Sequence, residues 1–397
     1  MPFAVYVLGL AVFAQGTSEF MLSGLLSSIA GDLHVSLAAA GLLTSAFAVG
    51  MVAGAPLTAL AGRTWPRRRA LLLFLGVFVA VHVVGALTSS YGVLLATRVV
   101  GALANAGFWA VALVTALALA GPQRRARATA VVVGGVTVAC VVGVPAGALL
   151  GELWGWRAAF WAVALVSVPA AVALLVAVPG GRPDGAPQAG ARSELRALAR
   201  PRLLLTLLVM ALVQGATFCT FSYLEPLVTR VTGFGAGWVP VVLALFGVGS
   251  FAGVTLAGRL ADARPDAVIG LGMTALAAGW AALALTAGHP VAALTLVLLQ
   301  GALAFGTGTA LITRVFHLAP DAPTMAGSFA TAAFNVGAAT GPWLGGLALG
   351  AGLGFRAPVW VSALLMCLAL AGTAALSVSS DAARRTLSVR RRPAPER

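Results

Sequence analysis

Charged residues are scarce in this 397-residue chain. They make up 9% of it, whereas 60% is hydrophobic and the mean hydropathy is +0.99. A soluble domain carries roughly 25% charged residues, and no soluble core could hide this much apolar surface, because the buried fraction rises only slowly with size. The composition therefore excludes a soluble protein and predicts a multi-span membrane protein.

Lysine is absent, since all 25 basic residues are arginine. A Walker A loop needs its lysine for the nucleotide phosphates, so the chain is not an ATPase of that type. The three cysteines, Cys140, Cys219 and Cys367, lie singly in apolar segments and are typical of inert buried thiols. The four histidines form no spaced cluster, so we predict no metal site, no cofactor and no enzymatic activity.

Segments long enough to cross a bilayer, about 20 apolar residues each, occur twelve times. The first begins with MPFAVY and has no basic residues before a long apolar run, so we expect a transmembrane helix, not a cleaved signal peptide. The predicted spans are 4–29, 36–61, 70–88, 91–119, 126–150, 157–178, 203–228, 236–257, 267–287, 291–313, 323–350 and 356–378.

The arginines orient these spans. Twenty-one lie in the even-numbered loops and the C-terminal tail, three (Arg157, Arg230 and Arg356) lie in odd-numbered loops, and Arg98 lies within a span. The positive-inside rule then places both termini in the cytoplasm. The net charge of +14 is explained by this asymmetry and by attraction to an anionic inner leaflet, so we expect no nucleic-acid partner. The bias towards Arg, Ala and Gly favours a GC-rich bacterial source and hence the bacterial inner membrane.

A polar stretch rich in Gly, Pro and Arg divides the chain. It predicts a cytoplasmic linker at 179–202 between a six-helix bundle at 1–178 and another at 203–378, followed by a basic tail at 379–397. The two halves share short sequence motifs. GWRAAFW at 155–161 returns as GFRAPVW at 354–360, LAGR at 60–63 returns at 256–259, and GALA at 101–104 returns at 301–304.

This internal repeat bears on function. Two parallel six-helix repeats are typical of transporters that bind substrate near the membrane midplane and work by alternating access. A channel has no need of such repeats, and a redox or rotary enzyme would need cofactor ligands that the sequence lacks. We therefore predict a secondary transporter.

Two charges lie inside predicted spans, Glu19 in the first and Arg98 in the fourth. Ionisable groups at membrane depth are costly and mark functional sites by default. Glu19 is either a structural ion-pair partner of Arg98 or a proton site. In a proton site, burial favours the protonated carboxyl and a nearby cation favours the ionised one, so the group can bind and release a proton. Arg98 either serves that site or extends to the membrane interface. We favour proton coupling for both.

Two further acidic residues lie near predicted span ends. Asp32 begins the first outer loop and either caps the second span or lines the outer mouth. Glu225 precedes Pro226 at the outer end of the seventh span and is expected to be interfacial.

Uncharged polar and aromatic residues within the spans predict a wide, mostly apolar binding site with a few hydrogen-bonding groups. Each is also compatible with ordinary helix packing. The candidates are Gln15, Asn105, Phe108, Trp109, Gln214, Phe218, Phe221, Gln300 and Asn335.

Two kinds of motif are candidates for a conformational gate. In the loops, arginines after a short Gly turn can dock on helix C-termini or simply obey the positive-inside rule. In the fifth and eleventh spans, Gly repeats every four residues beside a Pro, which permits close approach and bending or ordinary packing. The loop candidates are Gly62, Arg63, Arg67, Arg259 and Asp262; the span candidates are Gly143, Pro145, Gly147 and Gly151, with Gly337, Gly341, Pro342 and Gly345.

These motifs resemble those of the major facilitator superfamily, in its twelve-helix drug:proton antiporter branch. LAGRTWPRRR, RVVGALANAG and GVPAG match its loop, fourth-span and fifth-span motifs, although Gly62 stands where many members have Asp. GTSEFMLSGLL, GELWGWRAAFWAV and GSFATAAFNVGAATGPWLGG are similar to chloramphenicol-resistance exporters of high-GC bacteria. The resemblance implies export of chloramphenicol, with florfenicol as a second candidate, in exchange for protons by a monomer.

Two alternatives stay open. The first is an exporter of another small molecule, such as a sugar or a nucleoside, within the same branch. The second is a membrane sensor that transports nothing, which would be expected to carry a soluble signalling domain.

Overall fold

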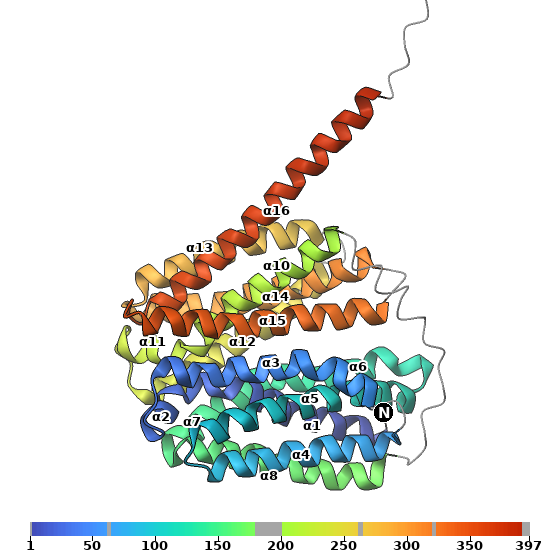
Figure 1. Cartoon of the computed structure of the whole chain (residues 1–397), viewed down its shortest axis with the longest axis vertical. Helices are drawn as coiled ribbons and strands as arrows, with labels where there is room; N and C mark the ends of the chain where they lie inside the picture. Colours follow the sequence, from blue (N-terminus) through green and yellow to red (C-terminus); the bar gives the residue numbers. More distant parts are fainter. Residues whose placement is uncertain (1, 62–64, 179–200, 261–264, 320–322, 391–397) are drawn as a thin grey trace, which may run out of the picture.

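The computed structural model describes residues 2–61, 65–178, 201–260, 265–319 and 323–390. All regular elements in these ranges are helices, and they form two bundles that lie against each other (Figure 1). The first bundle contains α1 (Phe3–Phe20), η1 (Met21–Gly24), α2 (Leu26–Asp32), α3 (Leu37–Ala61), α4 (Arg67–Leu87), α5 (Tyr91–Ala120), η3 (Pro122–Arg124), α6 (Arg125–Val138), η4 (Ala139–Gly143), α7 (Val144–Trp154) and α8 (Trp156–Ala177). The second contains α10 (Pro201–Ser222), α11 (Leu224–Arg230), η5 (Ala236–Trp238), α12 (Val239–Leu260), α13 (Pro265–Thr286), α14 (Pro290–Leu318), α15 (Pro323–Gly350) and α16 (Ala357–Arg390).

Eleven helical stretches in the described residues are long and apolar enough to cross a membrane. The twelfth, α15, has 28 residues but is rich in Gly, Thr and Ala and contains Asn335 and Pro342, which lowers its hydropathy. It packs between α10 and α3, one from each bundle. The prediction of an all-helical, multi-pass membrane protein with twelve spans is confirmed. The last span was predicted to end at 378, whereas the α16 backbone stays helical to Arg390.

Three spans are interrupted. The α-helix of the first span ends at Phe20, one residue after Glu19, and continues as the 3₁₀ turn η1 before α2. The seventh span breaks at the corresponding place, between α10 and α11. The fifth span contains a π-helical turn, η4, just before Pro145, which has no N–H to donate to the residue four positions earlier. The apolar runs had predicted one unbroken span at each of the three sites, with a bend permitted only at Pro145.

The glycine stripes pack inside the bundles, and the two stripes differ. In the C-terminal bundle, a Cβ at Gly341 would collide with the carbonyl oxygen of Gly215 on α10, so backbone meets backbone. In the N-terminal bundle, a Cβ at Gly143 would collide with the hydroxyl of Thr17 on α1, which is a side chain. Small residues permit such close approach in membrane helices.

The bundles meet through residues that cross from one core to the other. Phe20 of α1 packs in the C-terminal core, and Tyr223, between α10 and α11, packs in the N-terminal core. The Tyr223 hydroxyl donates to the carbonyl oxygen of Pro342 (2.9 Å), and its ring fills the space beside Gly41 of α3. Tyr223 directly precedes α11 and so lies towards the end of the molecule that holds α2 and α11, opposite the N-terminus (Figure 1). We call this the far end.

Candidate transport site

Glu19 lies on the last turn of α1 and is half-buried. Within the described residues its carboxylate makes no hydrogen bond and no ion pair. Gln15 precedes it by four residues and therefore shares its helix face. The Gln15 side chain is fully buried, and neither amide atom has a hydrogen-bond partner in the described part of the chain. An unpaired buried amide is costly, so this face is suited to a polar ligand.

Arg98 on α5 is 2% exposed, so it does not extend to the membrane interface. Its Nη1 donates to Ser18 Oγ and its Nη2 to the Ser18 carbonyl oxygen, both at 2.9 Å. The guanidinium carbon also lies 4.4 Å from the Phe47 ring centroid, within cation–π range. Arg98 thus contacts the residue next to Glu19, and the ion pair that the sequence left open does not form among the described residues.

Behind Ser18 lies a histidine. His82 on α4 is buried, with its Nε2 2.6 Å from Ser18 Oγ and its Nδ1 2.7 Å from the carbonyl oxygen of Phe78. The imidazole packs between the rings of Phe78 and Phe160. Three helices therefore converge on one serine hydroxyl. The sequence singled out neither Ser18 nor His82, because no spacing signal connects positions on α1, α4 and α5.

Aromatic rings gather where α1 meets the C-terminal bundle. The Phe20 centroid lies 5.6 Å from that of Phe218 and 6.5 Å from that of Phe221. The Phe221 ring lies 4.7 Å from Phe246, which in turn is 6.2 Å from Phe305. These separations are typical of interacting aromatic pairs. We call Phe20, Phe218, Phe221, Phe246 and Phe305 the aromatic cluster. Its first member, Phe20, follows Glu19 in the sequence.

The remaining predicted ligand residues do not all join this cluster. Phe108 and Trp109 pack in the N-terminal core, and Asn105 points its amide at the Met51 sulfur (3.4 Å). Gln300 turns towards α13, where its Nε2 donates to the carbonyl oxygen of Leu276 at 3.0 Å.

Two further predicted ligands lie on helices of the C-terminal bundle. Asn335 donates to Thr331 of its own helix, α15. Gln214 is half-buried on α10, one turn before Phe218.

The predicted gate residues are described only in part. Gly62, Arg63 and Asp262 lie outside the described residues, and Arg259 is described only as part of the α12 backbone. Arg67 is the first residue of α4 and is half-buried. Besides Gly143 and Gly341, Gly147 packs beside the Cβ of Met21 in η1. The gating role of these residues stays a prediction.

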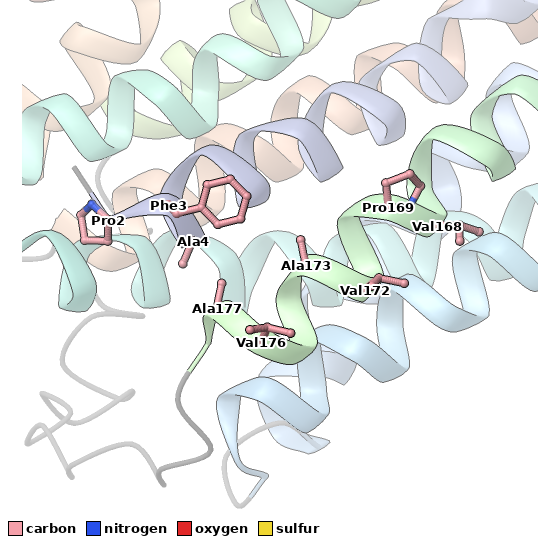
Figure 2. A pocket seen from close by; sticks show the side chains of 9 residues that line it. All are labelled: Pro2, Phe3, Ala4, Val168, Pro169, Val172, Ala173, Val176 and Ala177. Carbon is pink, nitrogen blue, oxygen red and sulfur yellow. The ribbon is translucent and has the colours of Figure 1, made fainter.

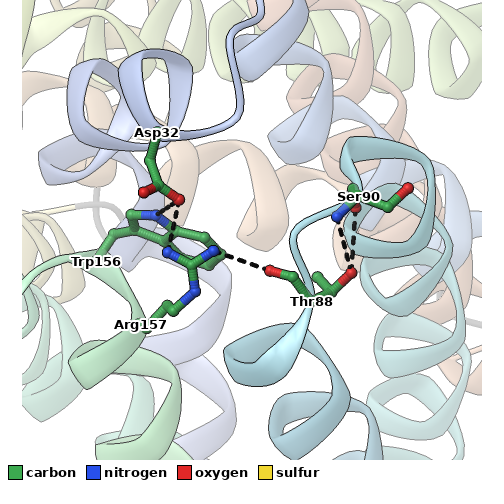
Figure 3. A network of polar contacts seen from close by, with 5 residues as sticks. All are labelled: Asp32, Thr88, Ser90, Trp156 and Arg157. Carbon is green, nitrogen blue, oxygen red and sulfur yellow. Dashed lines mark hydrogen bonds and ion pairs between the residues drawn. The ribbon is translucent and has the colours of Figure 1, made fainter.

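The far end of the N-terminal bundle is held by a polar network (Figure 3). Asp32 accepts hydrogen bonds from Arg157 Nη1 (2.6 Å) and Trp156 Nε1 (3.2 Å), and Arg157 Nη2 donates to the Thr88 carbonyl oxygen. The Arg157 hydrogen bond holds the pKa of Asp32 below its usual value. Asp32 does not cap the second span, since Ser36 Oγ accepts the Ala39 N–H instead.

The second acidic residue at this end joins the two bundles. Glu225 on α11 accepts hydrogen bonds from both the hydroxyl and the backbone N–H of Ser27 on α2. Its carboxylate therefore links the two bundles, whereas the sequence predicted only a position at the membrane interface. Together with Tyr223, it holds the far ends of the two bundles against each other.

An apolar groove of about 680 Å³ lies between the first turn of α1 and the C-terminal half of α8 (Figure 2). Its lining is Pro2, Phe3, Ala4, Val168, Pro169, Val172, Ala173, Val176 and Ala177. No polar side chain lines it, whereas small-molecule sites hold a few polar groups for orientation. The Gln15–Glu19 face and the aromatic cluster are therefore the better candidate site.

The family model of the Major Facilitator Superfamily matches residues 8–324. The chain belongs to this superfamily. It is a transporter and not an enzyme, as the sequence predicted. A protein of Streptomyces lividans named "Chloramphenicol resistance protein" is 56% identical over 372 residues, covering 93% of this chain and 95% of that protein. The inner membrane transport protein YdhP of Escherichia coli strain K12 is 33% identical over 368 residues, covering 93% and 94%.

Solved structures agree on the fold. A bacterial homologue of the human lysosomal transporter Spinster superposes with a TM-score of 0.76 over 99% of this chain and 98% of that one, at 19% identity. The nucleoside transporter NupG gives 0.73 over 94% and 98%, at 14% identity. The resemblance to the major facilitator superfamily and its fold is confirmed.

Proposed function

We propose that this transporter expels chloramphenicol from the cell in exchange for protons, and so confers resistance to the drug. The observation that supports the substrate is the 56% identity to the Streptomyces lividans chloramphenicol resistance protein over nearly the full length of both chains. Florfenicol, a close chemical relative of chloramphenicol, is proposed as a second substrate.

The chemistry of the candidate site suits this drug. Chloramphenicol is uncharged and combines an aromatic ring with hydroxyl and amide groups. In the proposal, its ring stacks in the aromatic cluster beside Phe218 and Phe221, and a polar group pairs with the buried amide of Gln15. Gln15 lies one turn before Glu19 on α1, and the aromatic cluster includes Phe20, the residue after Glu19.

Glu19 is proposed as the proton site. A half-buried carboxylate with no ion pair among the described residues can be neutral when protonated and can ionise when access changes. Arg98, held at the neighbouring residue, provides the cation that would stabilise the ionised form. Alternating access then loads the proton on one side of the membrane and releases it on the other.

The arginine distribution supports an inner-membrane location with both termini in the cytoplasm. In this orientation, α2, α11 and the Ser27–Glu225 contact lie on the outer side. The proposed working unit is a single chain, because both bundles of the transport site come from one polypeptide.

The test is expression in a drug-sensitive bacterium. Cells that insert the protein should tolerate more chloramphenicol and accumulate less of it, and an uncoupler should restore accumulation. The matched control is Glu19→Gln at equal membrane abundance, which should accumulate the drug like empty cells. Unchanged accumulation in cells with the wild-type protein would reject chloramphenicol and favour a sugar or nucleoside as substrate.

A further inference from the structure

The hydrogen bonds around Ser18 have a fixed direction. The carbonyl oxygen of Phe78 can only accept, so Nδ1 of His82 carries a proton and donates it (2.7 Å). In the neutral ring, Nε2 is then an acceptor, and the Ser18 hydroxyl donates to it (2.6 Å). The lone pairs of the same hydroxyl are left to accept from Nη1 of Arg98 (2.9 Å).

The chain of donors thus runs from Arg98 through Ser18 to His82 and ends on a backbone carbonyl. A doubly protonated His82 would break this order, because Nε2 would then donate to Ser18 and the serine proton would lose its acceptor. It would also place a second positive charge beside the buried guanidinium. The arrangement therefore requires a neutral imidazole, which acts as a fixed acceptor behind the serine.

We infer that Ser18 and His82 are positioning residues, which hold Arg98 at the backbone of α1 and keep it from pairing with the Glu19 carboxylate in this conformation. This inference rests on the proposed proton coupling at Glu19. Ser18 is one residue from Glu19, and the α-helix of α1 ends one residue after Glu19, at Phe20, before the 3₁₀ turn η1. If this turn rearranges as the bundles rock, Arg98 is released towards Glu19 and promotes loss of the Glu19 proton.

Other ionisable groups face this region from the helices packed on α1. Arg98 comes from α5, His82 from α4 and Cys140 from η4. Of these, only Arg98 carries a charge in the arrangement described above. Its position therefore sets the electrostatic environment of Glu19.

The first experiment is independent of transport. Purified full-length protein with ¹⁵N-labelled Arg and His is studied by nuclear magnetic resonance. In wild type we expect one guanidinium that exchanges slowly with solvent, assigned to Arg98 by its loss in Arg98→Lys, and one neutral histidine with an unprotonated nitrogen, assigned by its loss in His82→Gln. Exchange at Arg98 should accelerate about tenfold or more in Ser18→Ala and in His82→Leu, since each breaks a hydrogen bond in the chain.

The second experiment measures uphill chloramphenicol efflux in vesicles as a function of pH. Ser18→Ala and His82→Leu should slow efflux about tenfold and leave the half-saturating drug concentration within about twofold. They should also move the acid limb of the pH profile to lower pH, because the freed Arg98 cation favours the ionised Glu19 carboxylate. Ser18→Thr and His82→Gln keep a hydroxyl and an acceptor and should restore much of the rate. Ser167→Ala is the matched control, since among the described residues the buried Ser167 hydroxyl bonds only to Val163 of its own helix.

The outcomes separate the two proposals. If wild-type vesicles export chloramphenicol and both Ser18→Ala and His82→Leu keep its rate and pH profile, the inference is wrong and the proposed function stands. If wild-type vesicles export none, the proposed function fails, and unchanged Arg98 exchange in Ser18→Ala would then overturn the inference as well. Equal losses in Ser167→Ala would show a general packing effect and also contradict it.

Discussion

At the crossing of α1 with the fifth span, Gly143 packs on Thr17, and the next two residues of α1 are Ser18 and Glu19. At the equivalent crossing of α10 with α15, Gly341 packs on Gly215, and the next two residues are Ala216 and Thr217. The N-terminal bundle thus has a carboxylate where its repeat has an uncharged hydroxyl.

The same difference recurs on the fourth and tenth spans. Arg98 lies three residues before the word GALA at 101–104, whereas Leu298 lies three residues before its repeat at 301–304. In exchange, the C-terminal bundle supplies four of the five rings of the aromatic cluster. The two halves therefore share a packing plan and differ in chemistry, and this difference supports the proposal that the first half couples protons and the second binds the aromatic ring of the drug.

Of the variants that test this comparison, Arg98→Ala should have the largest effect on efflux. It removes the cation and leaves the Ser18 hydroxyl facing a cavity, so uphill efflux should fall at least about 100-fold with normal membrane insertion. Arg98→Lys should rescue poorly, because an ammonium group cannot reproduce the two-pronged contact with Ser18. Efflux in vesicles is the measurement, with insertion checked by membrane abundance. Full activity of Arg98→Ala would assign the arginine to structure alone.

Phe218→Ala tests the other half of the comparison. Loss of its contacts with Phe20 and Phe221 should raise the half-saturating chloramphenicol concentration about 10-fold. The dependence of efflux on the proton gradient should be unchanged, since no charge is altered. Phe74→Leu is the control, because its ring packs beside Gly107 in the N-terminal bundle. A loss of coupling without a change in half-saturation would place Phe218 in the proton machinery instead.

The glycine stripes provide a smaller, purely structural comparison. Gly341→Ala forces a methyl group against the backbone carbonyl of Gly215 and should destabilise the purified protein by about 1–3 kcal/mol. Gly143→Ala collides most closely with the Thr17 hydroxyl, which can rotate away at the cost of its hydrogen bond to Phe13, so the loss should be about half as large. Gly31→Ala, with open space around it, is the control. Thermal unfolding in detergent measures all three, and equal losses for Gly143→Ala and Gly341→Ala would remove the distinction between the stripes.

The smallest effect is expected at the far end. Arg157 pairs with Asp32, whereas Arg356, at the same place in the repeat, donates to the carbonyl oxygen of Leu285. Because the folded-state pKa of Asp32 is lowered, the pair stabilises the protein above the ordinary pKa of about 3.8 and loses this contribution as pH falls through the folded-state value.

Asp32→Asn should therefore lower the free energy of unfolding at pH 7 by less than about 1 kcal/mol for such an exposed pair, which is observed as a slightly lower melting temperature. The difference from wild type should shrink as the pH falls below about 3.8, the ordinary pKa of the carboxyl. A difference that does not shrink with falling pH would mean that the Asp32 charge is not the source of the stabilisation.

The spans and most of their ends could be predicted because hydropathy and arginine placement are local signals along the chain, whereas the breaks within the first, fifth and seventh spans and the end of α16 could not. The candidate site could be predicted only in part. Glu19 and Arg98 were found because charge is rare in these spans, and Phe218 and Phe221 because they accompany Gln214. Gln300 has the same composition signal and yet turns into α13, since composition does not say which way a helix faces.

The missed features all depend on contacts between distant segments. His82 gave no signal beyond being an isolated histidine, and its bond to Ser18 joins α4 to α1. Phe20 looked like any apolar residue of a span, although it packs in the opposite core. Glu225 was expected at the membrane interface, yet it accepts a hydrogen bond from Ser27 of the other bundle. Rotation and packing of helices decide such pairings, and neither is encoded by a short motif.

The central claim is that Glu19 in the N-terminal bundle couples proton entry to drug exit. Chloramphenicol is uncharged, so if at least one proton enters per drug expelled, each cycle carries positive charge inward. A membrane potential then contributes about 2.3 kcal/mol per charge per 100 mV. Glu19→Gln has the shape of the protonated acid but cannot release a proton, so drug binding should survive.

The most direct measurement uses vesicles with a potential imposed at equal pH on both sides. Wild-type protein should concentrate chloramphenicol against its gradient under these conditions, and Glu19→Gln should only equilibrate it. Equal accumulation by wild type and Glu19→Gln would contradict the account and make the Glu19 carboxylate a structural group.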